Sequence, residues 1–437
     1  MPKIRSRSPI VLPIAAAAAI AIAFVILNIG AYDGFFQDDE LDNLSWAPVL
    51  PARDFLVGFL KPTFDITNFR PTGSLYFALV GRGFGLNFAP WITPIFVFHL
   101  LNGLLLFLLM RKLAIERWSA IAGAAFFTLS AAAFDVYWKP MYIFDLLAAT
   151  FSLACVLSWA HRRWVLSFVS FWLAYKAKEI AVLLPAVLAI YEYWFGERRF
   201  RILIPFALAS LNFGIQGILR NPNHNNDYTM HFTPGALGRT VPFYAHRFLM
   251  FRGSGLLLGL LIFLRDRRIW FGLAGIVLTM VPLFVLPGRL FEAYVYLPLT
   301  FAAIALAAAG ARWNPVWAWV ALALWMPFNV RQIHRESRAT LAADDQAFSF
   351  VDTMEKWVAR RPEPGIFVYD GAPAGFHHWG ITAAWNIVHH ASGLRALFAD
   401  WPEGRKALAE ESVAFGAWDG KKNELRIYDR PRPSQPK

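Results

Sequence analysis

Four acidic residues lie close together near the start of the chain, in a short stretch that runs from residue 35 to residue 43. They are Asp38, Asp39, Glu40 and Asp42. Carboxylates at this spacing repel one another, which can raise the pKa of at least one of them. A carboxylate with a raised pKa is suited to act as a general base toward an uncharged hydroxyl. A solvated acidic loop that flanks a helix would explain the same residues without chemistry.

Basic residues recur at the expected ends of apolar segments on the same side as the acidic stretch. They are Arg70, Lys176, Lys178, Arg247 and Arg289. Side chains of this kind can extend to anionic lipid headgroups. They can also hold a lipid-linked phosphate and neutralise it when it leaves. Together with the acidic stretch, they predict transfer of a group from a lipid phosphate to a hydroxyl.

The composition indicates that membrane helices position these residues. Of the 437 residues, 57% are hydrophobic and 16% are charged, whereas soluble domains average about 25% charged residues. The net charge of +12 does not indicate a nucleic-acid partner, because the basic residues recur at the ends of apolar runs rather than along one surface stripe. We predict a polytopic α-helical membrane protein that contacts membrane lipids and binds no nucleic acid.

Length and hydropathy predict about eleven transmembrane helices. The expected spans are 10–30, 91–110, 118–137, 141–160, 164–176, 179–196, 200–219, 242–264, 269–287, 293–310 and 313–330. Basic clusters such as Arg111–Lys112 and Arg162–Arg163 fall on the side of the N-terminus, as the positive-inside rule requires. We therefore expect a cytoplasmic N-terminus and an extracytoplasmic C-terminus, in a bacterial inner membrane.

The chain is expected to divide into a membrane part and a small outer domain. Residues 1–331 form the transmembrane part, and its first outer loop, 31–90, carries the acidic stretch. Residues 332–429 have the composition of a small α/β domain, with a helical pattern from Leu341 to Val358, a strand at 365–369 and a hairpin around Asp419–Gly420. The Pro-rich residues 430–437 are predicted to be a disordered tail.

Four short motifs resemble those of membrane glycosyltransferases of the GT-C class. They are Phe36–Glu40, Asn68–Pro71, Phe98–Leu105 and Glu292–Pro298. Their order and spacing are similar to the protein O-mannosyltransferases, especially the branch that carries tetratricopeptide repeats, although this chain has no such repeats. The Lys178–Glu179 pair before an apolar run also resembles that branch. The resemblance covers residues 30–330 and implies a GT-C-like fold.

The resemblance also implies a reaction and a set of site residues. The donor would be a sugar, a mannose-like hexose, on polyprenyl phosphate, and the transfer would be inverting and extracytoplasmic. Carried over residue by residue, Asp39 is the preferred base, Asp38 is the alternative and Glu40 is their neighbour. The donor-phosphate ligands would be Arg70, Lys178 and Arg289. Further candidates are Lys176, Glu179, Glu292, Tyr294, His99 and Asn102.

No cofactor is required for this reaction, because a lipid phosphate is already a good leaving group. A divalent cation could still bind beside the acidic stretch. The pairs His377–His378 and His389–His390 lie in different segments without a supporting cysteine, so we predict no protein-held metal site. The acceptor, a protein, a glycan or a lipid, is left open.

Two other functions compete with this prediction. A transporter or flippase of a lipid-linked sugar would show an internal repeat and polar residues near the membrane midplane. Neither is visible in the sequence. A membrane acyltransferase would use a membrane-facing histidine, for which His99 is a modest candidate. His99 and Asn102 lie three positions apart, however, which is equally expected of hydrogen bonding between helices.

Overall fold

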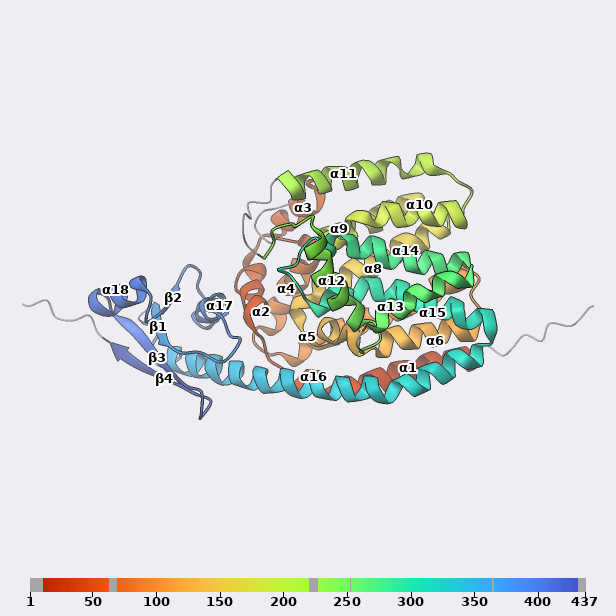
Figure 1. The fold of residues 1–437 in the computed structure, drawn as a ribbon. Helices are drawn as coiled ribbons and strands as arrows, with labels where there is room; N and C mark the ends of the chain where they lie inside the picture. Colours follow the sequence, from red (N-terminus) through yellow and green to blue (C-terminus); the bar gives the residue numbers. More distant parts are fainter. Residues whose placement is uncertain (1–10, 63–68, 220–226, 252, 364, 431–437) are drawn as a thin grey trace, which may run out of the picture.

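A bundle of helices and a small α/β module are joined by one long helix (Figure 1). The computed structural model describes residues 11–62, 69–219, 227–251, 253–363 and 365–430. The predicted helical membrane fold with a small C-terminal α/β unit is confirmed at this level. We refer to residues 366–430 as the C-terminal module, and to the end of the bundle that contacts it as the module end.

The bundle consists of long and short helices. The longer ones are α1 (Val11–Asn28), α4 (Pro71–Phe84), α5 (Ala89–Lys112), α6 (Arg117–Leu129), α8 (Ile143–Ala160), α9 (Trp164–Ala177), α10 (Leu184–Trp194), α11 (Ile204–Leu219), α12 (Pro234–Arg247), α14 (Arg267–Phe284) and α15 (Tyr296–Trp313). The shorter ones are α2 (Asp38–Trp46), α3 (Ala52–Leu60), α7 (Phe134–Trp138) and α13 (Ser254–Gly259).

Five helices in the described part of the chain are long and apolar enough to cross a membrane. A sixth span results if the bent pair 117–129 and 131–138 is counted as one. The chain is thus an integral membrane protein. The predicted count of eleven is not confirmed, because helices such as α9 and α10, with 14 and 11 residues, are shorter than the roughly 20 residues that a bilayer requires.

Two segments differ from their predicted structure. The expected span 242–264 is divided, because α12 ends at Arg247 and α13 begins only at Ser254, after Gly253 in the left-handed region (φ 74°). The first outer loop, 31–90, contains α3, where a short helix lying flat at the membrane surface was expected over Asp54–Leu60, but it also contains α2, which carries the acidic stretch, and α4. Three of the four acidic residues form the first turn of α2, where carboxylates favour the positive end of the helix dipole.

The helix α16 (Pro315–Val358) runs for 44 residues from the bundle into the C-terminal module. It crosses the domain boundary expected at residue 331 without a break. Its first half packs on α6 and α15, and its second half packs on α17 and β4. The residues Val351, Met354 and Val358, which gave the helical pattern, are buried along it. The bundle and the module are therefore connected by continuous helix rather than by a linker.

The C-terminal module is a four-stranded mixed sheet in the order β2-β1-β3-β4. The strand β1 (Ile366–Asp370) is parallel to β2 (Arg395–Phe398) and to β3 (Val413–Asp419), and β4 (Glu424–Arg430) pairs antiparallel with β3. The helix α17 (His378–Val388) follows β1, and α18 (Pro402–Glu410) leads from β2 to β3. The strand and the hairpin predicted from the sequence are both present. The predicted tail 431–437 lies outside the described residues.

Basic residues of several connections meet at the end of the bundle where α16 begins, close to Arg312 in the last turn of α15. Arg268 Nη1 donates to the carbonyl of Ala114 (3.1 Å), and Arg267 Nη1 donates to the carbonyl of Trp194 (2.9 Å). Arg162 forms an ion pair with Glu197. The connections after α5, α8 and α10 and the start of α14 therefore lie together, away from the module, as the basic pattern of the sequence predicted.

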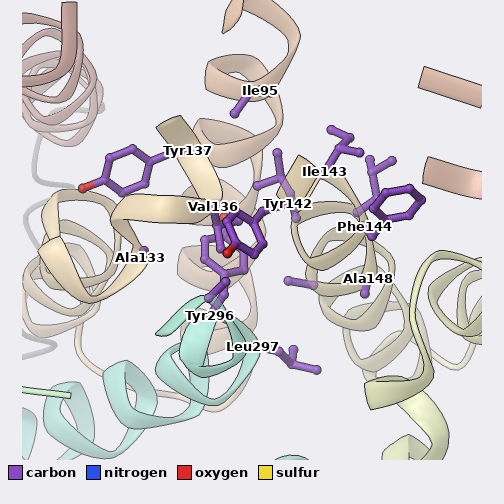
Figure 2. Close-up of a cluster of buried hydrophobic side chains, with 14 of the residues drawn as sticks. Ile95, Ala133, Val136, Tyr137, Tyr142, Ile143, Phe144, Ala148, Tyr296 and Leu297 are labelled. Atoms are coloured by element: carbon purple, nitrogen blue, oxygen red, sulfur yellow. The ribbon is translucent and has the colours of Figure 1, made fainter. Parts of the chain in front are cut away.

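The break between α6 and α7 is closed by Asn329 of α16. Its Nδ2 donates to the carbonyl of Leu129 (2.7 Å), and its Oδ1 accepts from the amide of Ala131 (2.7 Å). The segment beyond the break supplies the apolar cluster shown in Figure 2, where it meets Tyr296 and Leu297 of α15. A backbone break inside a membrane bundle is tolerated only when such partners satisfy it.

We expect Asn329→Ala to lower the free energy of unfolding by about 1–3 kcal/mol, because it leaves two buried backbone groups unpaired. Thermal unfolding in detergent measures the change. Ser337→Ala, which removes only an exposed hydroxyl from the same helix, is the matched control. Equal melting temperatures for both variants would contradict the role assigned to Asn329.

Candidate active site

Glu40 fixes the start of α2 at the module end of the bundle. The residue is 1% exposed. One carboxylate oxygen accepts from the amide of Gln37 (2.7 Å) and the other accepts from the amide of Met141 (3.3 Å). Burial raises the pKa of Glu40 to about 8, with a smaller contribution from the charge of Asp344. Glu40 therefore positions the acidic turn and does not face solvent.

Asp344 of α16 holds the segment before α2 from the other side. Its Oδ2 accepts from the amide of Phe35 (3.2 Å), and its Oδ1 accepts from Gln37 Nε2 (2.7 Å). Burial raises the pKa of Asp344 to about 6. The long helix thus contacts the candidate site directly, although nothing in the local sequence around Asp344 predicted this.

Asp38 is committed to the C-terminal module. Its Oδ1 accepts from the amide of His377 (2.7 Å), and a second hydrogen bond joins its Oδ2 to His377 Nδ1 (2.5 Å). Gly380 of α17 packs so closely that an added Cβ would lie 2.5 Å from Asp38 Oδ1. Burial raises the pKa of Asp38, and the hydrogen bonds from His377 oppose that rise. The alternative base is therefore already engaged on both oxygens.

Asp39 is the carboxylate of this turn that faces solvent. Its Oδ1 accepts a hydrogen bond from Trp379 Nε1 of the module (3.0 Å). Its Oδ2 accepts no hydrogen bond from a residue in the described ranges. The contact with Trp379 orients the carboxylate and leaves one oxygen open, which is the arrangement that a general base requires.

Two of the predicted phosphate ligands are paired with carboxylates. Arg70 Nε lies 2.8 Å from Glu179 Oε1, and Lys178 Nζ lies 2.5 Å from Asp145 Oδ2. Lys178 also lies over the ring of Tyr294, 4.5 Å from its centroid. Burial would raise the pKa of Glu179, but the Arg70 guanidinium outweighs burial and lowers it. These pairs balance their own charge.

Arg289 differs because it forms no ion pair with a carboxylate in the part of the chain that the structure describes. Its guanidinium lies over the rings of Tyr228 and Phe291, at 4.2 and 4.3 Å from their centroids. The Nε is buried and donates to no described residue. A cation with an unused donor, held between two rings, is suited to bind an anion.

Tyr228 relates the open carboxylate to the open cation. The guanidinium of Arg289 contacts its ring, 4.2 Å from the centroid. Burial raises the pKa of Tyr228, and the charges of Arg289, Arg70 and Asp39, together with Tyr294, have smaller effects on that pKa. Asp39, Arg70 and Arg289 are therefore candidates for one site at the module end.

The remaining candidates from the sequence lie elsewhere or serve other contacts. Lys176 Nζ donates to the carbonyl of Lys61 (2.6 Å). Glu292 forms an ion pair with Arg247. His99 Nδ1 lies 2.8 Å from the Tyr296 hydroxyl, to which Asn102 also donates (3.0 Å). The His99 and Asn102 side chains are fully buried, so the structure does not bring them to Asp39.

Several residues of the site were not selected from the sequence. Asp145 had a usable signal, since it is the one charged residue of the expected span 141–160 and ionisable residues within spans often mark functional sites. Trp379 had no signal, because its contact with Asp39 joins residues 340 positions apart. Within the described ranges, no group of three His, Cys, Asp or Glu residues has the arrangement of a metal site.

The fold is that of the GT-C class of glycosyltransferases, as the sequence motifs predicted. The apo crystal structure of ArnT from Cupriavidus metallidurans matches with a TM-score of 0.50 and 15% sequence identity, over 94% of this chain and 93% of that chain. A crystal structure of ArnT bound to undecaprenyl phosphate matches with a TM-score of 0.46 and 14% identity, over 93% of each chain. No family model and no curated protein matches the sequence.

We expect the contribution of Glu40 to stability to be lost as the pH rises. The unfolded chain releases this proton near the ordinary glutamate pKa of 4.5, whereas the folded protein retains it up to a pKa of about 8. The stabilising contribution of Glu40 is therefore fully present below its pKa in the unfolded chain, and it declines as the pH rises through its pKa in the folded protein. In Glu40→Gln, which cannot ionise, the melting temperature should fall less steeply over this pH window.

The measurement is the melting temperature of purified protein in detergent across that window. Glu410→Gln, which changes an exposed carboxylate on α18, is the control and should keep the wild-type slope. A slope in Glu40→Gln equal to that of wild type would show that the Glu40 proton is not retained on folding.

Proposed function

We propose that this chain is a glycosyltransferase that moves a hexose from a polyprenyl-phosphate donor to an acceptor hydroxyl. The observation that carries the proposal is that one carboxylate and one cation at the same end of the bundle each have an atom without a partner. Asp39 has an oxygen free for a proton, and Arg289 has a buried donor without a partner among the described residues. Both lie at one end of a membrane bundle with the GT-C fold.

In the proposed reaction, Asp39 Oδ2 removes the proton of the acceptor hydroxyl. The hydroxyl oxygen then attacks the anomeric carbon of the donor from the face opposite the phosphate. The bond between that carbon and the phosphate oxygen breaks, and the lipid phosphate leaves with the electron pair. Attack from the opposite face inverts the anomeric configuration, and the proton on Asp39 returns to solvent.

Arg289 is the first ligand of the leaving phosphate in this proposal. The charge that develops on the phosphate oxygen is stabilised by a cation already in place, which avoids reorganisation during the reaction. Arg70 and Lys178 are instead paired with Glu179 and Asp145. Because these pairs balance their own charge, removing Arg289 should affect the phosphate most.

The proposed orientation follows the basic pattern of the chain. The end of the bundle where Arg162, Arg267 and Arg268 meet would face the cytoplasm, according to the positive-inside rule. The module end would then be extracytoplasmic, with the membrane taken as a bacterial inner membrane. The choice of a mannose-like hexose rests on the resemblance of the motifs alone. The proposal also allows a divalent cation to bind beside the acidic turn, although the reaction does not require one.

We expect Asp39→Asn to reduce sugar transfer by roughly 100-fold or more, because the amide cannot take the proton. The assay follows release of polyprenyl phosphate from radiolabelled polyprenyl-phosphate hexose. Asp38→Asn keeps an acceptor oxygen toward His377 and should lose less than about tenfold. Wild-type turnover in Asp39→Asn, or a complete loss confined to Asp38→Asn, would reassign the base.

We expect Arg289→Gln to lower kcat/KM for the donor by roughly 10- to 100-fold, the range of one hydrogen bond to a charged group. Arg239→Gln, which changes an exposed cation on α12, is the control and should behave as wild type. Unchanged donor kinetics in Arg289→Gln would remove Arg289 from the phosphate site. If no variant or sugar gives turnover while labelled lipid crosses the membrane, the protein is a transporter.

A further inference from the structure

The indole of Trp379 stands beside the proposed base. Trp379 is the second residue of α17, and its N–H donates to Asp39 Oδ1 (3.0 Å). The ring of His377 stacks on the indole, with centroids 4.5 Å apart and planes at 10°. The residue is nevertheless 48% exposed. Because His377 covers one face, the exposed surface lies on the opposite face and the outer edge.

This exposure is not needed to hold the module in place. Trp385, further along α17, serves the module core: it is fully buried and stacks on Phe367. The docking of α17 on α2 rests on Asp38, with its two hydrogen bonds to His377 and its close contact with Gly380. A single exposed aromatic residue is ordinary, but Trp379 is held at a fixed angle beside the proposed base by its hydrogen bond to Asp39 and its stack with His377, so its open face is ready to bind an apolar surface.

We propose that the open face of Trp379 is an acceptor subsite that binds a neutral sugar ring. The inference rests on the proposed function and adds the class of acceptor. A pyranose ring has an apolar face of C–H groups, which packs on an aromatic ring, and an edge of hydroxyls, which needs hydrogen-bond acceptors. Trp379 supplies the aromatic ring on which the C–H face packs, and Asp39 Oδ2 at the edge of that ring supplies an acceptor for the hydroxyls.

The charges around the subsite select for a neutral acceptor. Asp42 lies three residues after Asp39, which places it on the same face of α2. The carboxylate of Asp39 at the edge of the ring accepts hydrogen bonds from hydroxyls. The charges of Asp39 and Asp42 on one face of α2 repel an anionic acceptor. A sugar ring that stacks on Trp379 therefore presents a hydroxyl to Asp39 without bringing a negative charge to the site.

A second exposed aromatic residue extends the surface away from the bundle. Trp401 is 40% exposed and packs edge-on against His378, the residue before Trp379, with centroids 4.6 Å apart. His378 Nδ1 lies 3.3 Å from the hydroxyl of Tyr369 at the end of β1. Carboxyl ends of parallel strands are common ligand sites in α/β folds. Trp401 is therefore the residue that would contact a second sugar unit, as a glycan or a glycolipid would present, in this proposal.

The test is saturation-transfer NMR on the full chain in nanodiscs with methyl pyranosides of glucose, mannose, galactose and N-acetylglucosamine. At least one should bind, and Trp379→Ala should weaken it by roughly threefold to tenfold. Trp379→Phe keeps an aromatic face without the N–H and should retain the sugar. Tyr428→Ala, which removes an exposed aromatic from β4 of the same module, should bind as wild type.

The same sugars linked to a dodecyl chain distinguish a glycolipid acceptor from a soluble glycan acceptor. Tighter binding of the dodecyl form than of the methyl form supports a glycolipid. Equal binding of the two forms supports a soluble glycan. Equal affinity in Trp379→Ala, no binding of any pyranoside, or Trp379-dependent binding of a Ser/Thr peptide instead would overturn the inference. Release of polyprenyl phosphate without acceptor tests the proposed function separately. If no polyprenyl phosphate is released but sugar binding still depends on Trp379, the sugar-binding subsite is supported and the proposed transfer reaction is contradicted.

Discussion

The rest of the site depends on the way in which the first turn of α2 is held by carboxylates. Glu40 binds the turn to the segment before α8, Asp344 binds it to α16, and Asp38 binds it to the module. Each of these acids accepts at least one hydrogen bond from a residue that is distant from it in the chain. Buried acids are costly unless they are satisfied in this way. With these three carboxylates engaged, the carboxylate of Asp39 is the one that the turn presents to solvent.

Charge compensation organises the other half of the site. Arg70, which precedes α4, is paired with Glu179, and Lys178 is paired with Asp145 in the first turn of α8. The charges of these two pairs largely cancel. Arg289 is instead held by aromatic rings, which stabilise a cation without neutralising it. An anion that enters the site therefore meets one unsatisfied positive charge among several satisfied ones. In the proposed reaction, recognition of the phosphate therefore depends on the unpaired Arg289 rather than on the total number of cations.

The sequence predicted the parts of this arrangement that depend on local pattern. Apolar runs located α5, α8, α14 and α15, and helical and strand spacing located the second half of α16 and the strands β1, β3 and β4, but not β2. Motif resemblance predicted the class of fold and brought Asp39 and Arg289 into one set of candidates. Both predictions use information that is contiguous in the chain.

The remainder could not be predicted because it depends on tertiary contacts. Nothing near Asp38 indicates that both of its oxygens will be used by a histidine 339 residues away. Nothing near Arg70 and Lys178 shows that each will meet a buried carboxylate. The number of membrane spans could not be predicted either, because short apolar helices in a packed bundle have the composition of membrane spans but not their length.

The continuity of α16 also limits how this protein can change over evolution. Asn329 anchors this helix to the bundle and Asp344 anchors it to the site, and the two lie 15 positions apart on one unbroken helix. A single residue inserted between them would turn everything beyond by about 100° and advance it by about 1.5 Å. The segment between these anchors should therefore have a fixed length.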